Sequence, residues 1–279
     1  MTRQTANKIH ELQRETHPSS VPSQAFALPG PSGKVGLAEE RPLLLGHRGA
    51  RAVSRLAASP GKRSVPPENS LACFEYALNH GCDGFEFDVR ITRDLRLVVC
   101  HNAWAGAYKV SASSFKSLSS RSAGQLACFE DVLREFADRA YLDIEVKVPG
   151  GEELIAKAIR HSRPRRGFLV SSFLPGVLRR LHELDPALPL GYVCSRSYNF
   201  SLWRKLPIEV FLPQHKLITH ALVEEVHKRG RRIFTWTVNH EEEVRQLAAW
   251  GVDGLISDDP KLLGHVFPVR RGRQEAVGE

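Results

Sequence analysis

The chain has 279 residues, of which 42% are apolar, a content that can form a sizeable core without disulfide support. The five cysteines are scattered and form no Cys-x-x-Cys pair, which argues against a disulfide framework or a structural zinc site and favours a reducing compartment. Neither an apolar run long enough to cross a bilayer nor a secretory signal segment is visible, so we expect a cytoplasmic protein.

The formal net charge of +8 favours anionic partners such as small phosphates, phospholipid headgroups or nucleic acid. The basic residues are spread along the chain, and they do not form one stripe with aromatic residues between them. We therefore expect a small phosphate substrate and no nucleic acid, and leave peripheral membrane contact open. The sequence does not predict the oligomeric state.

The two ends of the chain differ in composition from its middle. Residues 1–41 are rich in Pro, Ser, Gln and Gly with little periodicity, which predicts a mostly disordered leader. Residues 268–279 form a second polar tail. We expect a single folded domain over residues 42–267, a length that suits one large α/β barrel.

Between the tails, short apolar runs alternate with amphipathic stretches. This alternation predicts a parallel sheet with crossover helices, either a TIM (β/α)8-type barrel or, as the alternative, a doubly wound sheet. The expected strands are Leu43–His47, Gly84–Val89, Leu97–His101, Ala140–Lys147, Gly167–Ser171, Leu188–Cys194, Glu209–Pro213, Arg232–Val238 and Gly254–Ser257. The expected helices cover residues 70–80, 129–138, 151–162, 175–184, 219–229 and 241–250.

The third expected strand follows the second too closely to be its parallel neighbour. Only seven residues separate the two strands, whereas a parallel pair needs a crossover of a dozen or more. Residues 92–95 have the composition of a reversal, so we expect a hairpin that brings His101 to the level of Glu86 and Asp88. Removing this strand from the nine candidates leaves eight, the number that a closed barrel of this type needs.

Charged residues recur inside or at the end of apolar strands. Residues i and i+2 of a strand share a face, so Glu86 lies beside Asp88, and Glu145 lies beside Lys147. Buried charges are costly unless they are paired, bind a metal or lie at a strand end, where barrel enzymes place their active sites. Three carboxylates that converge there would form an oxygen site suited to Mg²⁺ or Ca²⁺ rather than zinc.

Two cations and two histidines accompany these carboxylates. Arg48 can bind two phosphate oxygens at once, and Lys147 supplies a point charge. His47 and His101 titrate near neutral pH and suit a general base and a general acid. Together these groups indicate cleavage of a phosphate ester, in which cations stabilise the phosphate charge and the histidines transfer protons.

Each residue also has a purely structural interpretation. A histidine at a strand end can be structural, and Glu86 and Asp88 can belong to an ion-pair network. Either Asn69 or Ser70 is a good N-cap for the helix that follows. The recurrence of costly residues at the strand ends of one alternating pattern favours a shared site.

The ordered motifs of the chain resemble those of the glycerophosphodiester phosphodiesterase family, over residues 43–263. Any one motif is weak, but their order and number are specific. The motifs are Leu45-Gly46-His47-Arg48-Gly49, Pro67-Glu68-Asn69-Ser70, Phe85-Glu86-Phe87-Asp88-Val89, Thr92-x-Asp94, Val98-Val99-Cys100-His101, Ile144-Glu145-Val146-Lys147, Ser172-Phe173, Trp236-Thr237-Val238-Asn239 and Gly251-Val252-Asp253-Gly254-Leu255-Ile256-Ser257-Asp258-Asp259-Pro260.

The resemblance implies a TIM barrel that converts a glycerophosphodiester to an alcohol and sn-glycerol 3-phosphate with a divalent metal, Mg²⁺ or Ca²⁺. The roles it implies are metal binding by Glu86, Asp88 and Glu145, base catalysis by His47, acid catalysis by His101, phosphate binding by Arg48 and Lys147, support by Glu68 and Asn69, and a pocket lined by Phe173 and Trp236.

Three other functions stay open. The same groups could run a phospholipase D-like or lyase reaction on lysolipids, in which a substrate hydroxyl attacks first. A catalytically weakened protein could bind phosphodiesters without turnover. A barrel glycosidase could use Glu86 and Glu145 as its carboxylate pair, although the neighbouring cations and histidines favour phosphate.

The chain departs from the family pattern at three places. Asn102 follows His101 where the family usually has Asp, so the charge beside this histidine is lost while a hydrogen-bonding shape is kept. The basic segment 50–66 is longer than usual and is either a specificity loop or a surface insertion. Residues 103–128 match the family poorly, so headgroup preference is not predicted.

Overall fold

The computed structural model describes residues 41–51, 66–122 and 126–268. The expected leader and C-terminal tail, and most of the basic segment 50–66, lie outside these described residues. Among the helices within them, none is long and apolar enough to cross a membrane.

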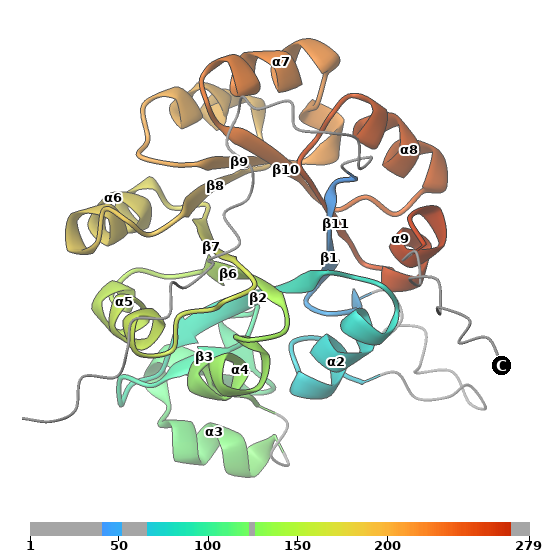
Figure 1. The fold of residues 1–279 in the computed structure, drawn as a ribbon. Helices are drawn as coiled ribbons and strands as arrows, with labels where there is room; N and C mark the ends of the chain where they lie inside the picture. The colour runs from blue at the N-terminus through green and yellow to red at the C-terminus, as the bar shows by residue number, and fades with distance from the viewer. Residues whose placement is uncertain (1–40, 52–65, 123–125, 269–279) are drawn as a thin grey trace, which may run out of the picture.

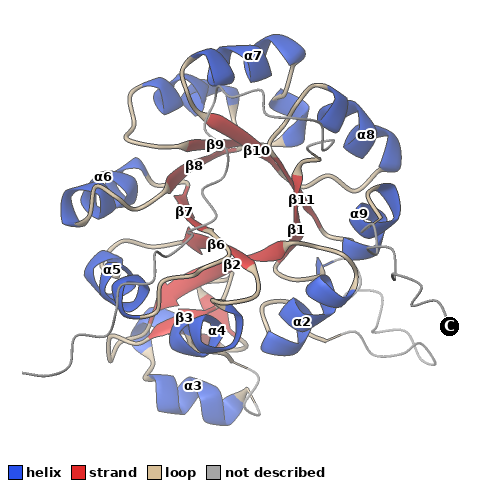
Figure 2. Ribbon diagram, viewed as in Figure 1, coloured by secondary structure: helices blue, strands red, loops and turns tan. Residues whose placement is uncertain are grey.

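Eight parallel strands form a closed barrel (Figure 2), which confirms the expected barrel and excludes the doubly wound sheet that the alternating pattern had left open. Closure follows from β1, which pairs with β2 through Leu45 and Gly84 and with β11 through Leu43 and Gly254. In chain order the strands are β1 (Leu43–His47), β2 (Gly84–Ile91), β6 (Tyr141–Val146), β7 (Phe168–Ser172), β8 (Leu190–Cys194), β9 (Val210–Pro213), β10 (Arg232–Thr235) and β11 (Gly254–Ser257).

Helices surround the strands on the outside of the barrel (Figure 1). The side chain of Ser70 accepts a hydrogen bond from the backbone N of Cys73 and caps the first described helix, so Asn69 is left for another role. The helices are α2 (Leu71–Asn79), α3 (Phe115–Arg121), α4 (Phe129–Phe136), α5 (Glu152–His161), α6 (Pro175–Leu184), α7 (His220–Lys228), α8 (Glu241–Ala249) and α9 (Pro260–Val266).

The expected hairpin after the second strand is confirmed. Strand β3 (Leu97–Val99) runs antiparallel to the far end of β2, with Val89 opposite Val99. The backbone N of Cys100 donates to the carbonyl of Asp88 at 2.9 Å, which leaves His101 near Asp88 in the middle of β2. The β3 strand is shorter than expected because the chain turns away at this point.

Several short elements were not predicted because they are too brief to show a hydrophobic period. The strand β10 also ends at Thr235, before the expected Val238. The unpredicted elements are β4 (Trp104–Ala105), β5 (Tyr108–Lys109), α3, α9 and the 3-10 helices η1 (Val110–Ala112), η2 (Ser197–Arg204) and η3 (His215–Leu217).

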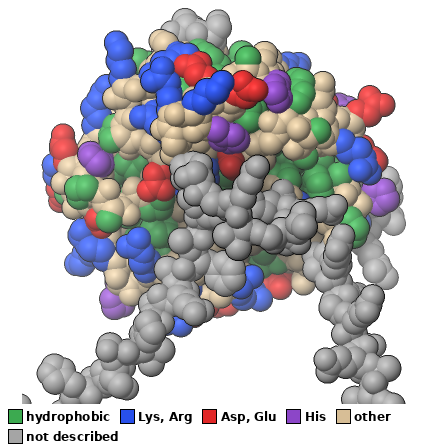
Figure 3. Space-filling view, turned by 45° about the horizontal axis from the view of Figure 1, so that its top comes forward, with side chains coloured by type: hydrophobic (Ala, Val, Ile, Leu, Met, Phe, Trp, Pro, Cys, Tyr) green, Lys and Arg blue, Asp and Glu red, His purple; other side chains and the backbone are tan. Residues whose placement is uncertain are grey.

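The core has two main layers, one on each side of the barrel wall. The larger packs the outer face of the strands against the helices, and a smaller apolar cluster fills the barrel interior. The interior cluster consists of Leu45, Tyr141, Leu169, Val193, Val210, Leu212, Phe234 and Ile256. On the face in Figure 3, Lys and Arg side chains are interspersed with acidic and polar ones, in agreement with the spread of charge along the sequence.

Candidate active site

A pocket of ≈ 240 Å³ lies at the carboxyl ends of the barrel strands. The chain reaches it from the ends of different strands, as the position of active sites in this fold predicts. Of the residues expected to be functional, those that line the pocket are His47, Arg48, Glu86, His101, Glu145, Lys147, Phe173 and Trp236.

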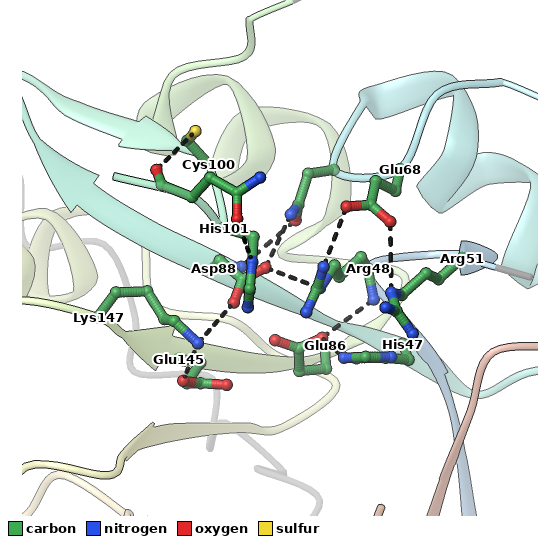
Figure 4. Close-up of polar contacts among 12 residues, drawn as sticks. His47, Arg48, Arg51, Glu68, Glu86, Asp88, Cys100, His101, Glu145 and Lys147 are labelled. Atoms are coloured by element: carbon green, nitrogen blue, oxygen red, sulfur yellow. Dashed lines mark hydrogen bonds and ion pairs between the residues drawn. The ribbon is translucent and has the colours of Figure 1, made fainter. Parts of the chain in front are cut away.

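Three buried carboxylates meet beside this pocket (Figure 4). Glu86, Asp88 and Glu145 each offer an oxygen that lies within 4.8 Å of the others. Burial and the charges of the other two carboxylates hold the pKa of Glu86 well above its usual value. Its Oε1 atom is buried and finds no hydrogen-bond partner within the described part of the chain. This hard-oxygen cluster can hold a divalent cation such as Mg²⁺ or Ca²⁺.

Lys147 neutralises part of this negative charge. Its Nζ lies 2.6 Å from Oε1 of Glu145 and 3.2 Å from Oδ1 of Asp88. Burial alone would lower the pKa of Lys147, but the two carboxylates raise it, so the ammonium stays charged. Burial alone would likewise raise the pKa of Asp88, but Lys147 and Arg48 lower it.

Arg48 follows directly after β1, in the left-handed region with φ of 50°. Few non-glycine residues adopt this conformation, and those that do cluster at functional sites. The backbone N of Arg48 donates to Oε2 of Glu86 at 3.0 Å, and its Nη1 donates to Oε1 of Glu68 at 3.0 Å. Its Nε lies 3.2 Å from Oδ2 of Asp88. The guanidinium is therefore held at the edge of the carboxylate cluster.

Asn69 supports the same corner of the site. It also has a positive φ, of 61°, and its backbone N donates to the carbonyl of Arg48 at 3.0 Å. Its Nδ2 donates to Oδ2 of Asp88 at 2.8 Å. Asn69 thus positions the backbone of Arg48 and the carboxylate of Asp88, while Ser70 performs the capping role.

His47 is nearly buried, and its ring is oriented by a carboxylate. Nδ1 lies 2.6 Å from Oδ1 of Asp258, while Nε2 lies 3.8 Å from Oε2 of Glu86. Because Asp258 can only accept when ionised, the proton is on Nδ1, and the lone pair of Nε2 is directed toward the site. Burial lowers the pKa of His47, and Asp258 opposes this shift.

His101 is half-buried on the opposite side of the pocket. Its Nδ1 lies 3.0 Å from Oδ1 of Asn102, and its carbonyl accepts two hydrogen bonds from Arg90, at 2.9 and 2.8 Å. Burial lowers the pKa of His101; Asp88 opposes this shift, and Arg48 adds to it. Asn102 therefore keeps the orienting contact but adds no negative charge.

The apolar wall of the pocket is aromatic. The rings of Phe173 and Trp236 meet edge to face with centroids 5.6 Å apart, and Nε1 of Trp236 donates to the carbonyl of Leu212 at 2.9 Å. Lys147 lies over the ring of Phe173 at 5.6 Å. This wall can pack against an uncharged part of a ligand.

Sequence reasoning assigned no role to four polar residues at this site. Asp258 accepts from Nδ2 of Asn239 at 2.9 Å as well as contacting His47. Asp143 and Ser171 line the pocket below the carboxylates. Two signals were available: Asp258 directly follows the last barrel strand, and Asp143 shares its strand face with Glu145.

Comparison with known proteins shows the same family along most of the chain. Residues 47–262 match the model of the glycerophosphoryl diester phosphodiesterase family. A glycerophosphodiester phosphodiesterase of Caldanaerobacter subterraneus subsp. tengcongensis is 30% identical over 229 residues, which cover 74% of this chain and 93% of the relative. One of Bacillus altitudinis is 28% identical over 234 residues, which cover 75% of this chain and 96% of the relative.

Solved structures show the same fold. A glycerophosphodiester phosphodiesterase of Thermotoga maritima has a TM-score of 0.66 at 22% identity, with 81% of this chain and 98% of the other covered. A phosphodiesterase of Oleispira antarctica, solved in complex with its product sn-glycerol-3-phosphate, has a TM-score of 0.66 at 20% identity, with 81% and 96% covered.

Proposed function

The chain belongs to the glycerophosphoryl diester phosphodiesterase family, and we propose that it hydrolyses glycerophosphodiesters to an alcohol and sn-glycerol 3-phosphate with a divalent metal and two histidines. The observation that carries this proposal is the convergence of Glu86, Asp88 and Glu145, with oxygens within 4.8 Å of one another, beside a pocket that His47 and His101 line.

The residues at the carboxylate cluster fit a divalent cation. The donors are hard oxygens, and the buried Oε1 of Glu86 has no hydrogen-bond partner among the residues that the structure describes. Glu86, Asp88 and Glu145 would hold the ion. A bound Mg²⁺ or Ca²⁺ supplies positive charge that stabilises the phosphoryl oxygens during the reaction.

Arg48 and Lys147 would bind the phosphate beside this ion. Glu68 and Asp88 hold the guanidinium of Arg48 from two sides, which limits its motion before substrate arrives. A preorganised cation costs little reorganisation when charge develops in the transition state. Because Arg48 also lines the pocket, a role in phosphate binding accounts for this arrangement better than a purely structural ion pair.

The two histidines would divide the proton transfers. His47 Nε2 would take a proton from the water that attacks the phosphorus atom, because its Nδ1 proton is already directed to Asp258. His101 donates a proton to the leaving alcohol oxygen as the ester bond breaks. In the free protein the pKa of His101 is lowered, which disfavours the protonated form that an acid needs. The negative charge of a bound phosphodiester would raise that pKa and favour the protonated form.

The direct test is release of sn-glycerol 3-phosphate from glycerophosphocholine and glycerophosphoethanolamine, measured with Mg²⁺, Ca²⁺, Mn²⁺ or chelator. We expect turnover with at least one of these ions and its loss in chelator, with recovery when metal is restored. Equal turnover in chelator would contradict the metal site. Tight substrate binding without turnover under every metal would instead support the weakened binding protein.

A membrane-facing surface is a further part of this proposal. The β4–β5 hairpin follows His101 closely and exposes 55% of Trp104 and 41% of Tyr108. Aromatic side chains with a polar edge favour the membrane interface, and the net charge of +8 favours anionic lipid. Co-sedimentation with vesicles of phosphatidylcholine and phosphatidylglycerol should weaken in Trp104→Ala, and equal binding by the wild-type protein and the variant would contradict this contact.

A further inference from the structure

We propose that Asp143 and Ser171 form a subsite on the floor of the active-site pocket that binds a hydroxyl group of the glycerol moiety of the substrate. The proposal rests on the glycerophosphodiesterase function and specifies how the pocket would recognise glycerol. It concerns two residues outside the carboxylate cluster and the histidine pair.

The sheet register places both residues next to the catalytic groups. Asp143 lies opposite Glu86 on the neighbouring strand, and Ser171 lies opposite Glu145. Because alternate residues of β6 share a face, Asp143 points into the barrel as Glu145 does. Both Asp143 and Ser171 line the pocket, although 0% and 1% of their surfaces are exposed, so they lie at its buried end.

The hydrogen bonds of the Asp143 carboxyl are incomplete. Ser171 Oγ donates to Oδ1 of Asp143 at 2.7 Å. The other oxygen, Oδ2, is buried and has no hydrogen-bond partner among residues 41–51, 66–122 and 126–268. A buried polar atom without a partner carries a substantial cost, so a ligand that completes this hydrogen bond gains affinity.

A hydroxyl group is the ligand chemistry that fits Oδ2. It can donate to an ionised carboxyl or accept from a protonated one. A hydroxyl can therefore hydrogen-bond to Asp143 in either protonation state. A phosphate anion would be repelled by the neighbouring carboxylates. Asp143 also lies outside the group of three carboxylates whose oxygens approach within 4.8 Å, which argues against a role as a metal ligand.

The surroundings of this floor match a glycerol carbon chain. Val193, Leu212 and Ile256 line the same pocket and belong to the apolar cluster of the barrel interior. Since Arg48 and Lys147 would hold the phosphate at the carboxylate cluster, the glycerol moiety would extend toward Asp143 and Ser171. An alcohol without such hydroxyls would leave Oδ2 unpaired.

The test compares two ligands that differ in these hydroxyls. Calorimetric titration with Mg²⁺ present gives dissociation constants for sn-glycerol 3-phosphate and for n-propyl phosphate. We expect the wild-type protein to bind the glycerol compound roughly 10- to 100-fold more tightly, the range for one buried group gaining its partner. Asp143→Leu should reduce this ratio to near one while the affinity for n-propyl phosphate changes little.

Two other variants keep the test decisive if Asp143→Leu does not fold. Ser171→Ala should reduce the ratio, because it removes the donor that orients Asp143. Asp143→Asn should retain most of the ratio, because an amide of the same shape still hydrogen-bonds to a hydroxyl. Equal wild-type binding of the two ligands, or a ratio unchanged in Ser171→Ala, would overturn the subsite, as would equal loss of both affinities in Asp143→Leu.

The outcome is separable from that of the proposed function. If the wild-type protein binds sn-glycerol 3-phosphate preferentially but releases none from glycerophosphodiesters, the subsite stands and the proposed hydrolysis fails. If it releases sn-glycerol 3-phosphate but does not distinguish the two ligands, the hydrolysis stands and the subsite fails.

Discussion

Nδ1 of His47 lies 2.6 Å from Oδ1 of Asp258, a residue 211 positions further along the chain. His47 ends the first barrel strand and Asp258 follows the last, and these two strands are paired where the barrel closes. Burial alone would raise the pKa of Asp258, but the hydrogen bond from His47 lowers it. The carboxylate therefore stays charged and directs the other nitrogen of His47 toward the pocket.

This contact predicts the behaviour of Asp258→Asn. We expect kcat to fall by roughly 100-fold, the lower end of what a positioned proton-transfer group contributes, with little change in KM. Asp258 raises the pKa of His47, so its replacement lowers that pKa further. A base is active only when unprotonated, so the acid limb of kcat/KM should move to lower pH.

The matched control is Asp259→Asn, which removes the neighbouring carboxylate that accepts from the backbone N of Lys261 at the start of α9. Because Asn caps a helix about as well as Asp, this variant should change thermal stability little and leave the pH profile unchanged. An acid limb that moves in Asp259→Asn, or stays in place in Asp258→Asn, would argue against this role of Asp258.

The neutral partner of His101 leads to a second prediction. Asn102→Asp would place a carboxylate at the position that now accepts from Nδ1 of His101, and a neighbouring negative charge raises the pKa of a histidine. An acid is active only when protonated, so activity should persist to higher pH than in the wild-type protein. The pH dependence of kcat/KM measures this, and an alkaline limb that moves to lower pH would contradict the acid role.

The raised pKa of Glu86 predicts how metal and stability are linked. The pKa of the Glu86 carboxyl is raised in the folded protein. Such a group makes the folded protein less stable as pH rises from the pKa of the unfolded chain toward that of the folded one. In chelator, Glu86→Gln should therefore have a higher Tm than the wild-type protein at neutral pH, with a smaller difference near pH 4. Added Ca²⁺ or Mg²⁺ should raise Tm in the wild-type protein and much less in the variant.

Glu242→Gln is the control for this comparison, because Glu242 is exposed on α8 away from the pocket. Its Tm should follow that of the wild-type protein with and without metal. A metal-induced shift of equal size in Glu86→Gln and the wild-type protein would place the bound cation elsewhere.

The sequence was sufficient for the features that depend on local spacing. Strand–helix alternation predicted a parallel sheet, the short gap before Leu97 predicted an antiparallel hairpin, and the remaining count of eight strands favoured the barrel. The pairing of Glu86 with Asp88 and of Glu145 with Lys147 followed from the two-residue period of a strand. These inferences need only neighbouring residues and the geometry of one element.

The features that the sequence did not reveal depend on closure and register. The partner of His47 is Asp258, and it could be assigned only once the first and last strands were known to pair. The contact between Asp143 and Ser171 likewise depends on how β6 is aligned with β7. The small elements over residues 103–122 were not predicted, because each is too short to show a hydrophobic period in the sequence.

The most direct test of the account is sn-glycerol 3-phosphate release from glycerophosphocholine by the wild-type protein, Glu86→Ala, His47→Ala and the control Glu242→Gln at a saturating concentration of the most effective metal. We predict wild-type turnover, unchanged turnover in the control and losses of at least about 100-fold in the two site variants. Turnover in Glu86→Ala and His47→Ala within a few-fold of the wild-type rate would contradict the assignment of this pocket as the active site.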